Sequence, residues 1–377
     1  MSQTEALSSP VSHAAATSSS RRPVGLWLMI ICVLIALMVI VGGATRLTNS
    51  GLSITEWHPI TGVVPPLDQA AWQAEFAKYQ RIPQYQLVNR GMSLDQFKSI
   101  YWWEWGHRLL GRLIGIAFFA PLVWFAVTRR LSARLAGRLV LILVLGGAQG
   151  VLGWYMVKSG LADRVEVSQY RLAAHLGLAF ILFALTFWTA LDVLRPRNRS
   201  LSGSRFGWAA TVLCGLVFCQ VLLGALVAGL RAGYRFNSWP LMEGRFVPNG
   251  AGAMRPFWRN FFENQAMVQF DHRIGAYLIL AAVIGLAAWG RSRSSAPVRR
   301  ALDLTLAAVI LQASLGIWTL LAVVPLLLGL FHQTGALVLF AASLNLAHAA
   351  SAPRASALPA QVRASQAAAT RSLGSGP

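Results

Sequence analysis

Residues 24–45 read VGLWLMIICVLIALMVIVGGAT, an apolar run of 22 residues without a charged side chain. A helix needs about 20 such residues to cross the hydrocarbon core of a bilayer. A backbone exposed to lipid must satisfy its own hydrogen bonds, so such a run forms a helix and not a strand. Seven further runs of this kind follow, at about 102–127, 137–157, 171–194, 207–230, 268–290, 301–323 and 327–348. The sequence therefore predicts an all-α integral membrane protein with eight transmembrane helices.

The composition is typical of a chain surrounded by lipid. Of the 377 residues, 55% are hydrophobic and 12% are charged, and the mean hydropathy is +0.53. Soluble domains carry about 25% charged residues. Most of the net charge of +20 lies in short basic clusters between the apolar runs, so we attribute it to topology and expect no nucleic-acid partner. The three cysteines, Cys32, Cys214 and Cys219, fall inside apolar runs, and we expect neither an outer disulfide nor a Cys-x-x-Cys metal site.

The positions of the basic clusters predict the orientation of the helices. They occur in both tails and in the loops after the second, fourth and sixth helices. By the positive-inside rule, all these segments and both termini lie in the cytoplasm. We expect disordered tails at 1–23 and 349–377, a cytoplasmic linker at 195–206, and long outer loops at 46–101 and 231–267. A mitochondrial presequence is the alternative for the N-terminal tail.

An internal repeat relates residues 24–194 to residues 207–348. It aligns Glu104-Trp-Gly-His107-Arg108 with Gln269-Phe-Asp-His272-Arg273. A second motif, Gln-x-x-Leu-Gly, begins at Gln149, Gln220 and Gln312, and its small residue allows close helix approach. The repeat predicts two tandem four-helix bundles.

Four of the seven histidines lie one in each even-numbered helix, near its predicted outer end: His107, His175, His272 and His332. Neutral imidazoles paired between two helices of one bundle can bind a haem iron from both faces. One pair in each half predicts two haems. Zinc or copper would favour four clustered donors, and the repeat separates these donors into two pairs. The structural alternative for each histidine is a bond to a neighbouring helix.

Two arginines, Arg108 and Arg273, directly follow the histidines of the second and sixth helices. They are candidates for contacts to haem propionates, with interfacial snorkelling as the alternative. All four histidines lie near predicted helix N-termini, which also favour anions.

The two halves differ at the position three residues before the first histidine. Glu104 lies one helical turn from His107, whereas Gln269 takes this place before His272. A carboxylate can accept and deliver protons and an amide cannot. We therefore expect a reactive site in the N-terminal half, with Glu104 as catalytic residue, and an electron-carrying site in the C-terminal half. The alternative is an interfacial Glu104 paired with a nearby arginine.

These features resemble the haem A synthase family over nearly the whole chain except the tails. The resemblance rests on GGATRLT at 42–48, GLSITEWHP at 51–59, the Glu104-x-x-His107-Arg108 motif and the three further histidines. The outer loops lack cysteine pairs, so the chain resembles the proteobacterial and mitochondrial branch of that family.

The resemblance implies oxidation of the C8 methyl group of haem O, through hydroxylated intermediates, to the formyl group of haem A. It implies a haem b cofactor between His272 and His332 and the substrate haem between His107 and His175. Haem b then relays electrons to an external acceptor. Haem O synthase and cytochrome oxidase assembly factors are the implied partners.

Two other functions fit the same histidines. One is a bis-haem electron-transfer cytochrome, which four histidines at one depth disfavour, and the other is a haem carrier without chemistry. A homo-oligomer is compatible with each function. The strong preference for arginine over lysine favours a bacterial inner membrane, with the haem sites towards the periplasm.

Overall fold

The computed structural model describes residues 10–162, 164–195 and 205–351. Within these residues, eight helices are long and apolar enough to cross a membrane, as expected. They are α1 (Pro10–Leu47), α4 (Leu94–Val127), α5 (Ala133–Leu161), α6 (Gln169–Leu194), α7 (Arg205–Gly229), α9 (Gln265–Gly290), α10 (Ala296–Leu321) and α11 (Leu326–Ala350). Most of the predicted linker and almost all of the predicted C-terminal tail lie outside the described residues.

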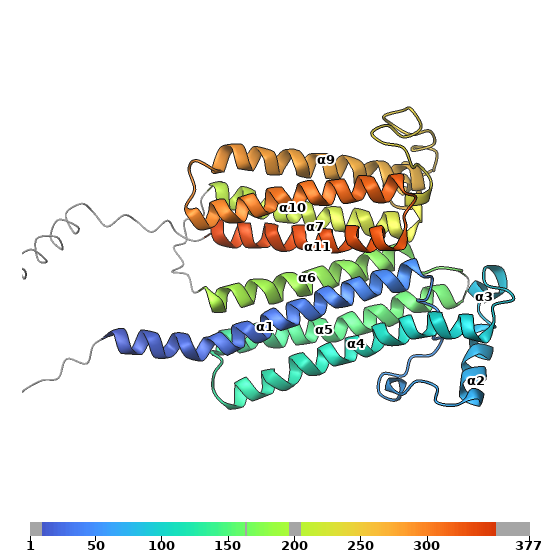
Figure 1. Cartoon of the computed structure of the whole chain (residues 1–377), viewed down its shortest axis with the longest axis horizontal. Helices are drawn as coiled ribbons and strands as arrows, with labels where there is room; N and C mark the ends of the chain where they lie inside the picture. The colour runs from blue at the N-terminus through green and yellow to red at the C-terminus, as the bar shows by residue number, and fades with distance from the viewer. Residues whose placement is uncertain (1–9, 163, 196–204, 352–377) are drawn as a thin grey trace, which may run out of the picture.

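The eight helices form two groups of four that lie side by side (Figure 1). In the first group α1 packs on α4, α4 on α5, α5 on α6 and α6 on α1, which closes a ring. In the second group α7, α9, α10 and α11 close a ring in the same order. The groups meet where α6 packs on α7 and where α11 packs on α1 and α6.

Two helices, α1 and α4, begin much earlier than the apolar runs predict. Helix α4 begins at Leu94 because Ser93 and Gln96 form a capping box, in which each side chain bonds the backbone of the other. Its first two turns therefore stand outside the apolar segment. Helix α1 begins at Pro10, inside the tail expected to be disordered, where an alanine-rich sequence favours helix.

The outer segments form a cap at the end of the molecule away from the N-terminus (Figure 1). The cap contains η1 (Thr61–Val63), α2 (Gln69–Tyr79), α3 (Pro83–Leu87), η2 (Ala232–Tyr234), η3 (Phe257–Arg259) and α8 (Asn260–Glu263). Tyr79 and Phe97 are fully buried in its N-terminal part, where they join the core around Trp72. This core fixes the first outer loop over the N-terminal bundle.

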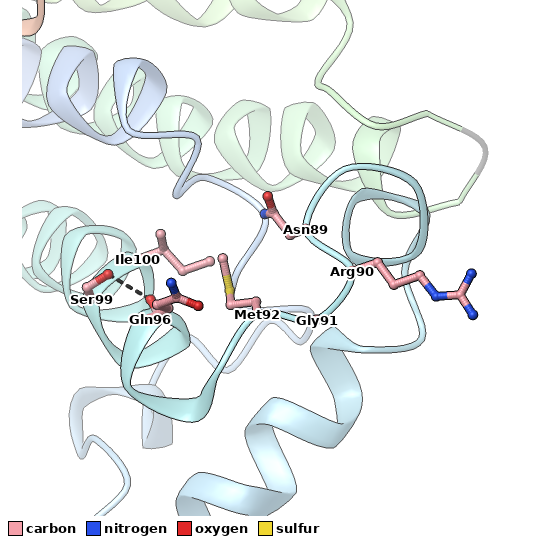
Figure 2. Close-up of a pocket in the computed structure, with 7 residues that line it drawn as sticks. All are labelled: Asn89, Arg90, Gly91, Met92, Gln96, Ser99 and Ile100. Atoms are coloured by element: carbon pink, nitrogen blue, oxygen red, sulfur yellow. Dashed lines mark hydrogen bonds between the residues drawn. The ribbon is translucent and has the colours of Figure 1, made fainter.

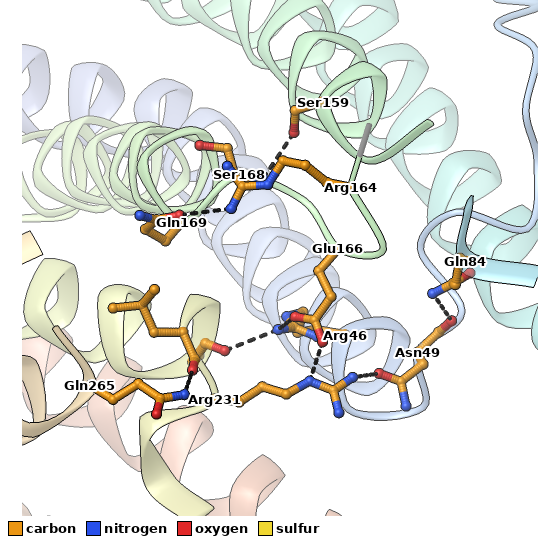
Figure 3. A network of polar contacts seen from close by, with 12 residues as sticks. Arg46, Asn49, Gln84, Ser159, Arg164, Glu166, Ser168, Gln169, Arg231 and Gln265 are labelled. Carbon is orange, nitrogen blue, oxygen red and sulfur yellow. Dashed lines mark hydrogen bonds and ion pairs between the residues drawn. The ribbon is translucent and has the colours of Figure 1, made fainter. Parts of the chain in front are cut away.

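An ionic network joins the two bundles at the capped end (Figure 3). Glu166, in the loop between α5 and α6, accepts a hydrogen bond of 2.5 Å from Arg46 at the end of α1. Glu166 also pairs with Arg231, which follows α7 and bonds Asn49. Arg46 further donates to the carbonyl oxygen of Ala228 on α7, at 3.1 Å. One carboxylate thus connects elements of both halves.

The contact between α6 and α7 requires a glycine at position 229. A Cβ atom there would lie 2.7 Å from Cβ of Gln169 and 2.8 Å from its Cα. We predict that Gly229→Val separates the two helices and lowers stability by about 1–3 kcal/mol. The measurement is the thermal unfolding temperature in detergent. Gly147→Val is the matched control, because nothing lies within 4 Å of a Cβ there; equal unfolding temperatures would contradict the packing described.

Candidate functional site

The C-terminal pair, His272 and His332, lies between α9 and α11. The two ring centres are 6.3 Å apart and the ring planes are 84° apart. Nδ1 of each ring lies 3.1 Å from a glutamine Nε2, that of Gln220 for His272 and of Gln312 for His332. The other ring nitrogen of each histidine, Nε2, has no hydrogen-bond partner among the described residues.

This spacing can be compared with what two axial ligands of one metal require. A bond of about 2.0 Å from metal to imidazole on each side, with roughly 1 Å more from each nitrogen to its ring centre, puts the ring centres roughly 6 Å apart. The C-terminal pair has this separation and two free nitrogens. Its geometry therefore fits a haem iron held from both faces.

The N-terminal pair, His107 and His175, lies between α4 and α6. Nε2 of His107 lies against Gly42 of α1, where a Cβ atom would be 3.1 Å away. The ring of His175 lies against Gly153 of α5, with Cε1 only 2.9 Å from the position of a Cβ. The structure thus brings His272 and His332 together, and the pairing of His107 with His175 stays a prediction.

One expectation about these histidines was wrong. His175, His272 and His332 lie in the second turn of their helices, close to the N-terminus. His107 is 13 residues after Leu94, because α4 extends into the cap. At 3.6 residues per turn this is more than three turns, too far for the helix N-terminus to act on a ligand there.

Arg108 and Glu104 attach the first outer loop to α4. Arg108 donates to the carbonyl oxygens of Ile54 and Glu56, both at 2.8 Å. Glu104 is 3% exposed, and its Oε1 accepts from Arg108 at 2.7 Å. Its Oε2 accepts from the Ser53 hydroxyl at 2.8 Å and from the Ile54 amide at 2.9 Å. The arginine pairing weighed as the alternative for Glu104 is therefore present.

Arg273 and Gln269 attach the second outer loop to α9 in the same manner. Arg273 donates to the carbonyl oxygens of Phe236 at 3.0 Å and Ser238 at 2.9 Å, again two residues apart. Gln269 is buried and donates to the Phe236 carbonyl at 2.9 Å. The amide of Gln269 thus takes the place of the Glu104 carboxylate, but it donates to a loop carbonyl, whereas Glu104 accepts from the loop and from Arg108.

The donors for a metal occur as pairs in the described part of the chain, which holds no group of three or more His, Cys, Asp or Glu side chains suited to one ion. An open hollow of about 440 Å³ lies in the cap, lined by residues 89–92 and by Gln96, Ser99 and Ile100 (Figure 2). It contains none of the four histidines. The two pairs are therefore the candidate site.

The COX15-CtaA family, described as cytochrome oxidase assembly protein, matches residues 25–344. The chain belongs to this family. The matched region contains all four histidines and most of the eight long helices.

Curated relatives resemble the chain over most of their length. A haem A synthase of Parvibaculum lavamentivorans is 55% identical over 325 residues, which cover 86% of this chain and 93% of the relative. A haem A synthase of Azorhizobium caulinodans is 52% identical, with coverage of 88% and 95%. A haem A synthase of Nitrosomonas eutropha is 48% identical, with coverage of 87% and 93%. The eight apolar helices make the chain a multi-pass membrane protein, and these relatives are bacterial.

Several residues at the site were not expected from the sequence. In the Gln-x-x-Leu-Gly motif only the glycine was assigned a role, in helix packing, and in the structure the glutamines bond to histidines. Ser53 and Ile54 were visible only as part of the loop motif at 51–59. Their contact with Glu104 depends on how the loop folds back over α4.

The role of Arg273 in holding its loop leads to a test. We predict that Arg273→Met leaves the Ser238 carbonyl without its donor and the Phe236 carbonyl with that of Gln269 alone, so amide hydrogen exchange in residues 236–239 speeds up. Arg245→Met is the control, because its exposed side chain has no hydrogen bond among the described residues. Unchanged exchange in Arg273→Met would show that the loop is held by other contacts.

Proposed function

We propose that the chain is a haem A synthase that oxidises the C8 methyl group of haem O to a formyl group, through hydroxylated intermediates. The observation that carries this proposal is a histidine pair in each bundle of a chain about half identical to proteins of that name. The product, haem A, is used by cytochrome oxidase, in agreement with the description of the family.

Haem b is the proposed cofactor, held by His272 and His332. Bound there, haem b would supply electron transfer, with His272 and His332 as the residues that would hold its iron. Arg273 keeps one buried donor, Nε, without a partner, and this group suits a propionate oxygen. Arg108 is the corresponding proposed contact for the substrate haem, although its two Nη groups hold the first outer loop.

The substrate haem is proposed to lie between His107 and His175, which orient its macrocycle. Glu104 lies one turn from His107 and is the nearest carboxylate to it in the sequence of α4. Oxidation of a methyl group to a formyl group releases protons, and a carboxylate can accept them. Arg108, Ser53 and the Ile54 amide hold this carboxylate in one position. Glu104 is therefore the proposed proton acceptor.

The proposed location is the bacterial inner membrane, with both termini in the cytoplasm and the haem sites towards the periplasm. The loops after α4 and α9, whose sequences are basic, lie at one end of the bundles, and the cap lies at the other (Figure 1). The second turns of α6, α9 and α11 are at the capped end, so both pairs lie on the same side. This arrangement does not favour electron transfer across the bilayer. Haem O synthase, oxidase assembly factors and an external electron acceptor are the proposed partners.

The test is Glu104→Gln in cells that also supply haem O. Gln269 shows that an amide can occupy this kind of position and still hold a loop, so we expect the variant to fold and retain haem b. Loss of the proton acceptor should lower haem A formation by about 10²–10⁴-fold. The measurement is extraction of the bound haems, followed by chromatography and mass determination.

Gln269→Glu is the matched control, because it alters the corresponding position of the other bundle. It should leave haem A formation close to that of the wild type. Formation of haem A by Glu104→Gln at the wild-type rate would remove Glu104 from the reaction. Absence of haem A from the wild type under the same conditions would contradict the proposed function itself.

A further inference from the structure

Three of the four histidines lie against a repeated pair of residues on the adjacent helix. Each pair is a glutamine followed four residues later by a glycine, so both face the same side of the helix. The pairs are Gln149 and Gly153 beneath His175, Gln220 and Gly224 beneath His272, and Gln312 and Gly316 beneath His332. A Cβ on the three glycines would lie 2.9, 3.2 and 2.8 Å from Cε1 of the ring. The glycine gives the ring its space and leaves the glutamine beside it.

The glutamines make different contacts in the two bundles. In the C-terminal bundle, Gln220 and Gln312 each place Nε2 3.1 Å from Nδ1 of their histidine, and Nε2 of Gln220 also donates to the His272 carbonyl oxygen at 2.7 Å. In the N-terminal bundle, Gln149 donates to the backbone carbonyl of His175 at 3.0 Å, and Nδ1 of that ring is buried without a partner. The ring of His175 is therefore not held by its glutamine.

The fourth histidine has no glutamine. His107 lies against Gly42, and the residue four positions earlier on α1 is Met38. A thioether cannot donate a hydrogen bond. In the described part of the chain, the ring of His107 makes no hydrogen bond. Both rings of the C-terminal pair are thus anchored through Nδ1, and neither ring of the N-terminal pair is.

A hydrogen bond to the nitrogen that does not bind the metal fixes the rotation and tautomer of an imidazole and strengthens it as a ligand. Oε1 of Gln220 and Oε1 of Gln312 are buried without partners. Rotation of either amide brings this oxygen to Nδ1, where it accepts the Nδ1 proton and leaves Nε2 of the histidine free for iron. For Gln220 this rotation breaks the 2.7 Å hydrogen bond that its amide nitrogen donates to the His272 carbonyl oxygen. For Gln312 the rotation breaks no other hydrogen bond, because its amide nitrogen bonds only Nδ1 of His332.

We propose that Gln220 and Gln312 are positioning residues that make the C-terminal pair a permanent haem holder. The missing anchors at His107 and His175 make the N-terminal pair an exchangeable one, through which a substrate haem enters and a product haem leaves. This inference rests on the proposed function, in which each pair binds one haem.

The first experiment uses the full-length protein purified in detergent, with apomyoglobin in excess as haem acceptor. Gln220→Leu and Gln312→Leu should each speed the loss of haem b by about tenfold, the size of effect typical for partners of metal-bound histidines. Gln149→Leu is the matched control and should leave haem b loss unchanged. Equal rates of haem b loss in the wild type and in both leucine variants would overturn the proposal.

The second experiment separates positioning from structural damage by measuring the midpoint potential of haem b. Gln312→Glu places a stronger proton acceptor at Nδ1, which makes His332 more basic and should lower the potential. Gln312→Leu removes the acceptor and should raise it. A shift in the same direction for both variants, or no shift, would assign Gln312 a packing role only.

The third experiment adds the missing anchor. Met38→Gln should slow the release of haem from the N-terminal pair to apomyoglobin by about tenfold and leave haem b loss unchanged. If Met38→Gln releases haem at the wild-type rate, the missing glutamine is not what makes the N-terminal pair exchangeable. If the wild-type protein binds no haem, the proposed function is contradicted. If it holds haem b but no variant changes the rate of haem loss, this inference alone is contradicted.

Discussion

A polar side chain within a bilayer has no water to bind, so it must find its partner on a neighbouring helix. This constraint shapes both bundles. Each imidazole lies against a glycine of the adjacent helix, which lets the two helices approach closely. Because four helices close into a ring, the second and fourth helix of the C-terminal bundle bring two imidazoles together with their planes nearly perpendicular. The separation of 6.3 Å between the rings of His272 and His332 is the clearest result of this packing.

The arginines that follow the first histidine of each bundle connect the bundles to the outer loops of the cap. Arg108 and Arg273 each hold two loop carbonyls separated by one residue, so the loops are fixed at the same relation to the histidines. Within this shared arrangement, the two halves differ by the replacement of Glu104 with Gln269. It changes one group from a carboxylate to an amide and keeps its place at the loop. Two sites with one scaffold can therefore differ in proton chemistry.

The sequence predicted the parts of the structure that depend on local pattern. Apolar runs of sufficient length give helices in lipid whatever surrounds them, and the spacing of the histidines in the repeat predicted the contact between His272 and His332. The start of α4 was missed because a capping box at Ser93 extends the helix beyond the apolar run. The contacts of Gln220 and Gln312 could not be predicted, because they depend on which neighbouring helix the motif faces. Arg108 was expected near a propionate, and its bonds to the loop arise from the fold of residues 51–59, which no periodicity describes.

The two histidine pairs are proposed to be separate haem sites with different occupants. The most direct measurement is the reduced-minus-oxidised spectrum of the protein purified from cells that make haem b and no haem O. We expect His272→Ala and His332→Ala each to lose the low-spin b-type spectrum and His107→Ala and His175→Ala to keep it. A b-type spectrum that survives in both C-terminal variants, or that disappears in the N-terminal variants, would contradict the account.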